Sequence, residues 1–173
     1  VFRCARKTGL VKEDTRLSFL GFGTMNGKDG KPFKTREGGV MRLENLIADI
    51  DEEMFTKIVE NRSVRDKDAR DTAKIVGLAA IKYGDLSNQA TKDYIFDVDR
   101  FTSFEGNTGP YILYTIVRIK SILNRYVEAG GNLEAGEILP ASNGSEKNLM
   151  LQLSGFGSMI ESAFEEKAPH KIC

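Results

Sequence analysis

A glycine-rich, basic stretch over residues 21–39 holds the side chains best suited to chemistry in this chain. Lys31 and Lys34 flank Pro32-Phe33, and Thr35 follows the second lysine. Glycines let backbone N–H groups approach an anion closely, and lysines bring mobile point charges to phosphate oxygens. The stretch therefore predicts a phosphate-binding loop, with a basic surface hairpin as the alternative. It is not a P-loop, because the GxxxxGK[ST] pattern is absent.

The remaining residues offer little support for other chemistry. His170 is the only histidine, and Cys4 and Cys173 stand near opposite ends with no CxxC spacing. These residues disfavour a zinc site and a Ser-His-Asp triad, so we expect no metal site and no bound cofactor. Unpaired cysteines are typical of a reducing compartment, and no run is apolar for long enough to span a membrane. We therefore expect a cytoplasmic protein without a membrane partner.

The charge balance leaves nucleic-acid binding open. Lysine and arginine number 25, aspartate and glutamate also number 25, and the formal net charge is zero. A strongly basic chain would have indicated nucleic acid, so any RNA contact must come from a local patch or from shape. The 173 residues suffice for one sizeable domain or two small ones. Because the chain begins at Val1 rather than at a methionine, we expect it to be a fragment of a longer protein.

Helices must position the basic stretch, because the residues that follow it have helical periodicity. Apolar residues recur at steps of three and four and predict four helices, over residues 43–60, 66–83, 109–129 and 145–167. Pro110 favours the first turn of the third helix, and Gly130-Gly131 ends it. Asn143 and Glu146 predict a capping box at the start of the fourth.

Extended structure is predicted in two places. Apolar residues alternate imperfectly near residues 16–21 and indicate a strand, and residues 94–98 alternate like a short strand or extended segment. The basic stretch is predicted to turn at Asn26-Gly27 or at Asp29-Gly30. The expected fold class is therefore mostly α, a helical bundle with a small β element before residue 41.

Two segments resemble arginyl-tRNA synthetases. The first is GFGTMNGKDGKPFKTREGGVMRLENLI, residues 21–47, in which Lys31-Pro32-Phe33-Lys34-Thr35 corresponds to the Lys-Met-Ser-Lys-Ser loop of class I synthetases. The second spans residues 74–123, and its core SFEGNTGPY, residues 103–111, is similar to the entrance of the anticodon-binding domain in that family. Together the two matches cover most of residues 1–126.

The chain also departs from the family pattern. Phe19 stands where family members often have histidine before the loop, and Leu113 and Ile116 replace a glutamine and a histidine that commonly follow the proline. The His-Ile-Gly-His signature and the arginine-selecting residues lie upstream in the family, and neither is present here. Polar side-chain contacts at Phe19, Leu113 and Ile116 are therefore not expected.

The resemblance implies a division into three parts. Residues 1–41 would end the catalytic domain with the ATP-phosphate loop, as a small β and loop remnant of its Rossmann-type fold. Residues 42–104 would form a helical region that contacts the tRNA stem. Residues 105–173 would begin the helical anticodon-binding domain.

The resemblance also implies a function. The whole enzyme would join arginine to tRNA(Arg) through an arginyl-adenylate, with ATP as a substrate accompanied by Mg²⁺. Lys31 and Lys34 would act in catalysis by stabilising the charge of the departing pyrophosphate. ATP would also contact Thr35 and the backbone of Gly21, Phe22 and Gly23. We expect the enzyme to be a monomer and this fragment alone to be inactive.

The third helix carries the residues expected to contact tRNA. Arg118 and Arg125 are seven residues apart and share a helix face, which suits phosphate contacts. Tyr111 and Tyr114 are candidates for stacking on bases, with burial in the core as the alternative. Two other functions compete with the synthetase interpretation. One is a non-catalytic helical RNA-binding module derived from a synthetase, and the other is an unrelated phosphate-binding enzyme with a helical lid.

Overall fold

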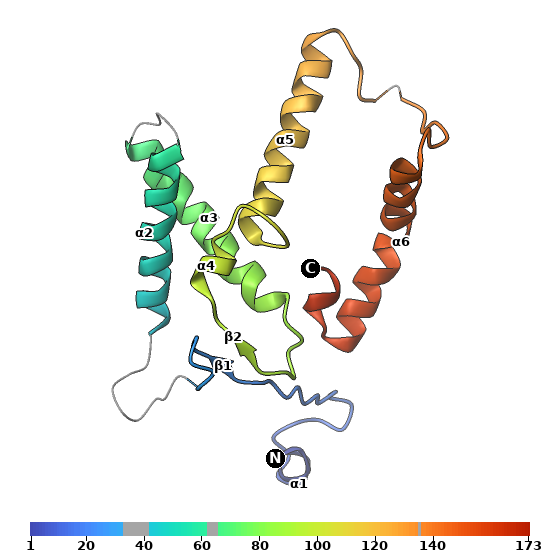
Figure 1. Cartoon of the computed structure of the whole chain (residues 1–173). Coiled ribbons are helices and arrows are strands. Elements are labelled where there is room, and N and C mark those ends of the chain that lie inside the picture. The colour runs from blue at the N-terminus through green and yellow to red at the C-terminus, as the bar shows by residue number, and fades with distance from the viewer. Residues whose placement is uncertain (33–41, 62–65, 135) are drawn as a thin grey trace.

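The computed structural model describes residues 1–32, 42–61, 66–134 and 136–173. It is mostly α-helical, as predicted (Figure 1). The elements are, in order, α1 (Phe2–Lys7), β1 (Met25–Asn26), α2 (Leu43–Asn61), α3 (Asp66–Leu86), β2 (Tyr94–Ile95), α4 (Val98–Phe101), α5 (Gly109–Glu128), α6 (Gly144–Glu166) and the 3-10 turn η1 (Pro169–Lys171). The four long helices confirm the four predicted ranges, and the largest difference is at the end of α3, which continues to Leu86.

The strand predicted near residues 16–21 is wrong. Strand β1 forms instead at Met25–Asn26 and pairs in parallel with β2 at Tyr94–Ile95. A strand needs a hydrogen-bonding partner and a buried face. Within residues 16–21, Phe19 is 83% exposed. The strand partner near Tyr94 pairs further along the chain, since the N–H of Tyr94 donates to the carbonyl of Thr24 (3.1 Å). The alternation at residues 94–98 gives strand β2, which ends just before α4 begins at Val98.

The core lies where α2 packs along α3 and is closed by the segment around β2 and α4. Its buried members come from these elements: Leu46, Ile50, Met54, Ala73, Val76, Phe96 and Phe101. The rings of Phe96 and Phe101 meet edge to face with centroids 4.8 Å apart. Gly84 on α3 leaves room for the Phe101 ring, because a Cβ there would lie 2.7 Å from it. Leu46, Ile50 and Met54, which recur at steps of four along α2, are thus the part of its apolar repeat that builds the core.

The first turn of α5 is fixed against α3. Thr108 caps the helix, since its Oγ1 accepts from the N–H of Tyr111 (3.2 Å) and donates to the carbonyl of Ser103 (2.6 Å). Gly109 and Pro110 are buried, and a Cβ at Gly109 would lie 2.9 Å from the backbone nitrogen of Ala80. The predicted opening of this helix is confirmed. Its predicted end is also confirmed, because Gly130 follows with a φ of +87°.

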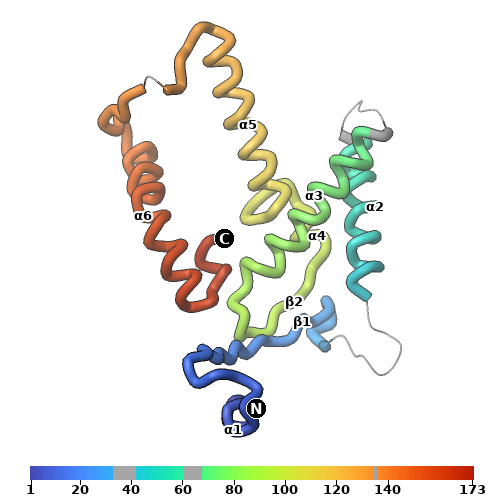
Figure 2. The backbone as a smooth tube through the Cα atoms, turned by 180° about the vertical axis from the view of Figure 1, so that it is seen from behind, coloured from blue at the N-terminus to red at the C-terminus, as the bar shows by residue number. Residues whose placement is uncertain are grey.

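Helix α6 runs back toward α3, so that the C-terminal residue lies beside that helix (Figure 2). The predicted cap is confirmed, since Oδ1 of Asn143 accepts from the N–H of Glu146 (2.9 Å). The Glu146 carboxylate in turn accepts from the N–H of Ser142 (2.7 Å), one residue earlier than in the usual capping box. Helix α6 ends where Lys167 adopts the left-handed conformation, with a φ of 53°.

Candidate functional site

A tight turn presents Lys31 to solvent. The N–H of Gly30 donates to the carbonyl of Gly27, and the N–H of Gly27 donates to the carbonyl of Lys31, both at 2.9 Å. Gly30 has a φ of +74°, which favours glycine, and Oδ1 of Asp29 accepts from the N–H of Lys31 (3.1 Å). Of the two predicted turns, the structure therefore forms the one at Asp29-Gly30. The Lys31 residue is exposed at the exit of this turn.

Lys28 ties this turn to the start of α4. Its Nζ lies 3.3 Å from Oδ1 of Asp97 and also hydrogen-bonds to Asp99. The hydrogen bond to Asp99, followed by that to Asp97, raises the pKa of Lys28, and the ammonium lowers the pKa of Asp99. Because its charge is already paired, Lys28 is poorly placed to bind a phosphate. Lys31 has no salt bridge within the described residues, so its charge is the available one.

Gly21, Phe22 and Gly23 lie immediately before β1. The N–H of Gly23 donates to the carbonyl of Ala90 (2.7 Å), and a Cβ at Gly23 would collide with the backbone of Lys92. Gly23 is thus required by the fold and its N–H is already bonded. Gly21 has open space, since a Cβ there would meet only a ring atom of Phe19 at 3.7 Å. The Phe22 side chain is 88% exposed and is available to a ligand.

Lys34 and Thr35, predicted respectively as a catalytic and an ATP-binding residue, lie outside the described residues. The structure therefore describes four residues of the predicted ATP site. Gly21, Phe22 and Gly23 lie just before β1, and Lys31 follows the turn that comes after β1.

Tyr111, Tyr114 and Arg118 form an exposed group on the first turns of α5. Each tyrosine is 41% exposed, and stacking on bases stays a prediction beside the alternative of partial burial in a core. The two ring centroids are 6.4 Å apart, and the Arg118 guanidinium donates to the Tyr114 hydroxyl (3.3 Å). The Cζ of Arg118 lies 5.6 Å from the Tyr114 ring centroid. Exposed aromatic rings beside a guanidinium suit stacking on unpaired bases.

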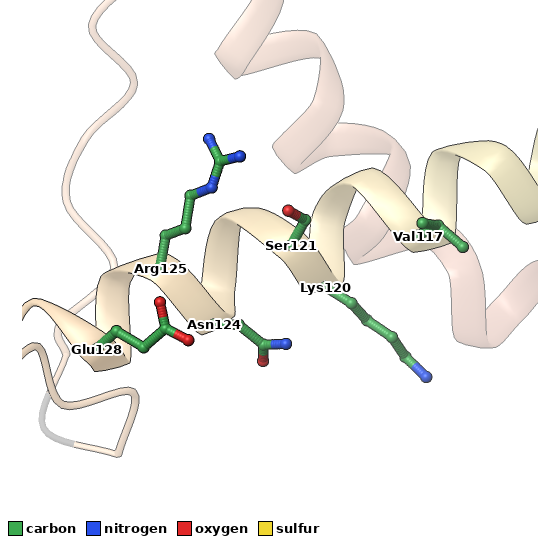
Figure 3. A pocket seen from close by; sticks show the side chains of 6 residues that line it. All are labelled: Val117, Lys120, Ser121, Asn124, Arg125 and Glu128. Carbon is green, nitrogen blue, oxygen red and sulfur yellow. The ribbon is translucent and has the colours of Figure 1, made fainter. Parts of the chain in front are cut away.

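Arg125 lies further along α5, at a shallow hollow of about 430 Å³. Figure 3 shows that the lining comes from one helix: Val117, Lys120, Ser121, Asn124, Arg125 and Glu128. Arg125 and Lys120 extend away from each other (Figure 3). Both residues line the hollow although their side chains point apart, and Arg118 is not part of its lining. Sequence reasoning did not select Asn124 or Ser121, although their spacing of three and four from neighbouring lining residues was a usable signal.

The described residues offer few other sites. No group of three or more His, Cys, Asp or Glu among them is placed to hold a metal ion. None of the described helices is both long and apolar enough to cross a membrane. Cys4 and Cys173 are both free thiols.

Comparison with known proteins identifies the family. Residues 1–98 match the family model described as tRNA synthetases class I (R), catalytic domain, and residues 112–173 match the DALR anticodon binding domain. The chain therefore belongs to the class I (R) tRNA synthetase family. The resemblance to arginyl-tRNA synthetases expected from the sequence is confirmed.

Several relatives are arginine–tRNA ligases. That of Agathobacter rectalis is 66% identical and that of Alkaliphilus oremlandii is 57% identical, each across 100% of this chain. The chain spans 30% and 29% of their respective lengths. Among solved structures, the arginyl-tRNA synthetase of Plasmodium falciparum superposes with a TM-score of 0.73 at 26% identity, over 98% of this chain and 28% of that one. The Thermus thermophilus enzyme gives 0.67 at 25% identity, over 88% of this chain and 24% of that one.

Proposed function

We propose that the full-length protein joins arginine to tRNA(Arg), using ATP and passing through an arginyl-adenylate. One observation carries the proposal, namely that a synthetase catalytic-domain match at residues 1–98 and an anticodon-binding match at residues 112–173 occur in one chain. A non-catalytic RNA-binding module would need only the second match. The identity of 66% to an arginine–tRNA ligase supports arginine as the amino acid.

We propose the same three-part division as the sequence predicts. Residues 1–41 end the catalytic domain, residues 42–104 contact the tRNA stem, and residues 105–173 begin the anticodon-binding domain. The buried Gly109-Pro110 turn supports a junction near residue 105, since it is where α5 leaves the core formed by α2 and α3. Cytoplasmic location and a monomeric state also stay predictions.

The proposed chemistry at this end of the ATP site is electrostatic. Adenylation breaks the bond between the α- and β-phosphates, and negative charge grows on the departing pyrophosphate. Lys31 and Lys34 would stabilise that charge, and Thr35 would add a hydroxyl donor. Lys31 is supported by its exposure and by the absence of a salt bridge among the described residues. Mg²⁺ would arrive with ATP rather than at a protein cluster.

The nucleoside would lie against the segment before β1. Gly21 and Phe22 are the better placed contacts, because Phe22 is exposed and Gly21 has open space. Gly23 contributes by permitting the close approach to Lys92 that holds this segment in place. The N–H of Gly23 already donates to the carbonyl of Ala90, so this N–H is not the group that would contact the nucleotide. Gly23 would instead border the nucleotide because it has no side chain.

The tRNA would meet the exposed surface of α5. Tyr111 and Tyr114 offer rings for stacking, and Arg118 and Arg125 offer guanidinium groups for phosphates. The hollow adds Lys120 and Asn124 beside Arg125. Because the formal net charge is zero, this local grouping rather than the overall charge would attract RNA.

Charging assays test the proposal directly. Full-length protein is incubated with ATP, total tRNA and each amino acid in turn, and the ester formed is measured. We expect arginine alone to be attached. Attachment of a different amino acid, or tRNA binding without any ATP consumption, would overturn the proposal. The 173-residue chain by itself should not catalyse arginine-dependent exchange of pyrophosphate into ATP, because catalysis needs groups outside it held in one geometry.

A further inference from the structure

The segment proposed to border the nucleoside, residues 21–24, lies on the connector between α3 and β2, residues 87–93. The N–H of Gly23 donates to the carbonyl of Ala90 (2.7 Å). A Cβ at Gly23 would lie 2.2 Å from the carbonyl oxygen of Lys92, so the two backbones are in direct contact. Strand β1, which continues the segment, lies beside β2, which continues the connector (Figure 2). The connector therefore sets the path of the segment.

One side chain takes part in this contact. Oδ1 of Asp93 accepts from the N–H of Thr24 (2.7 Å), a residue 69 positions earlier. Among the described hydrogen bonds between residues 21–26 and residues 90–96, no other involves a side chain. The carbonyl of Thr24 accepts in turn from the N–H of Tyr94 (3.1 Å). Both backbone groups of Thr24 are thus held, and the bond to Asp93 is of the stronger kind because its acceptor is a carboxylate.

The connector is itself attached to α3 near both of its ends. Near its start, the side-chain amide of Asn88 donates to the carbonyl of Gly84 (2.5 Å). Just past its end, the hydroxyl of Tyr94 donates to Oδ1 of Asp85 (2.6 Å). Asp93 is the residue next to this second attachment. Its carboxylate therefore has a defined place relative to α3 and to the core.

We propose that Asp93 is a positioning residue for ATP, which holds the N–H of Thr24 and thereby directs Gly21 and Phe22 toward the nucleoside. The inference rests on the proposed function, in which Gly21 and Phe22 border ATP. Asp93 acts through Thr24 and does not touch the phosphates, because a carboxylate repels phosphate oxygens. What Asp93 supplies is a hydrogen-bond acceptor at a fixed place, so an uncharged oxygen at the same place should serve as well.

Two substitutions in the full-length protein separate the acceptor from its charge. Asp93→Ala removes the acceptor, and Asp93→Asn keeps an oxygen at the same position without the charge. In the charging of tRNA with arginine, Asp93→Ala should raise the KM for ATP about tenfold, the size expected for one lost hydrogen bond to a charged group, with kcat and the KM for arginine within about twofold. Asp93→Asn should keep the KM for ATP within about threefold of the parent. An unchanged KM for ATP in Asp93→Ala, or an equal rise in both variants, would overturn the proposal.

Asp14→Ala is the matched control, because it removes the same charge from another exposed position before β1. Asp14 forms none of the salt bridges among the described residues. Exposed charges are screened by salt, so its loss should keep the KM for ATP within about twofold of the parent. An equal rise in Asp14→Ala would assign the effect to net charge, and an equal rise in the KM for arginine in Asp93→Ala would assign it to general loosening. Either result would overturn the positioning role.

Hydrogen exchange in the full-length protein tests the contact without any charging assay. The Thr24 amide should exchange about tenfold faster in Asp93→Ala than in the parent, and nearly as slowly in Asp93→Asn as in the parent. Equal exchange in the parent and in Asp93→Ala would overturn the proposal. If the parent attaches no arginine to tRNA, the proposed function fails, and the Kd for ATP measured by equilibrium dialysis then decides. A Kd raised about tenfold in Asp93→Ala would support the positioning role, and an unchanged Kd would overturn it.

Discussion

Gly109 lies so close to the carbonyl of Ala79 that no β-carbon fits between them. The contact places the first turn of α5 directly on the backbone of α3, with Pro110 buried beside it. A glycine at this point is therefore a packing requirement rather than a need for unusual backbone angles. The GNTGPY sequence that resembles the entrance of the anticodon-binding domain thus has a physical role at a helix crossing.

Gly109→Ala should destabilise the protein by about 1–3 kcal/mol, the range for overpacking a well-packed contact. The added methyl group meets backbone atoms of Ala79 and Ala80, which cannot move aside as a flexible side chain would. Urea unfolding of parent and variant gives the difference in free energy of unfolding.

Gly155→Ala is the control for that measurement. Gly155 lies within α6 and has open space where a Cβ would stand. The substitution should therefore stabilise the helix by about 0.5–1 kcal/mol through backbone entropy and helix propensity. A lower free energy of unfolding for Gly109→Ala together with a higher one for Gly155→Ala would support the close contact of α5 with α3 at Gly109. No change in the free energy of unfolding for Gly109→Ala would contradict that contact.

Tyr94→Phe should lower the free energy of unfolding by about 1–2 kcal/mol at neutral pH, since it removes a hydrogen bond to the Asp85 carboxylate. Burial, and then the hydrogen bond to Asp85, raises the pKa of Tyr94 far above 10.0, its ordinary value. The unfolded phenol ionises first as the pH rises through its ordinary value, so the stabilisation from Tyr94 is lost above that pH. Denaturation is measured below and above pH 10.0, the ordinary pKa of tyrosine. The free energy of unfolding should fall more steeply with pH in the parent than in the variant. Parallel losses would contradict the assignment.

Glu146→Gln should remove an acid sensitivity from the start of α6. Hydrogen bonds from the backbone N–H and then the hydroxyl of Ser142 lower the pKa of Glu146 below 4.5, its ordinary value. The cap is therefore fully formed above that value and is lost as the pH falls through the lowered pKa. The protection of the Ser142 amide against hydrogen exchange should fall in acid in the parent. In the variant the protection should be weaker and should not change with pH. The same acid response in both proteins would contradict the cap.

The sequence predicted the long helices well because each has a recurring apolar stripe, and α5 and α6 also have marked ends. Thr108-Gly109-Pro110 and Asn143 mark two starts, and Gly130 marks an end, so local chemistry alone placed those boundaries. The strand near residues 16–21 failed because its alternation had no partner strand, and pairing is a non-local property. Strand β1 pairs with residues 94–95, some seventy positions later, which no local pattern reveals.

The candidate site was only partly predictable for a similar reason. The Asp29-Gly30 turn and the exposure of Lys31 follow from residue type. The ion pairs of Lys28 do not follow from residue type, because its partners Asp97 and Asp99 come from a distant part of the sequence. Likewise, the Tyr83 hydroxyl lies 2.5 Å from Oδ1 of Asn107, which is 24 residues later, and that contact depends on how α5 meets α3.

Lys34→Ala in the full-length protein tests the catalytic role of the loop most directly. Lys28→Ala is its matched control, since it removes the same charge from a lysine already paired with two carboxylates. Adenylate formation is measured in a single turnover at saturating ATP and arginine with tRNA present, because the family is expected to need tRNA for activation. Loss of a contact that acts on the departing pyrophosphate should slow Lys34→Ala about thirty- to a thousandfold, and Lys28→Ala should stay within about threefold. A Lys34→Ala rate within about twofold of the parent would contradict the account and leave the loop a basic surface hairpin.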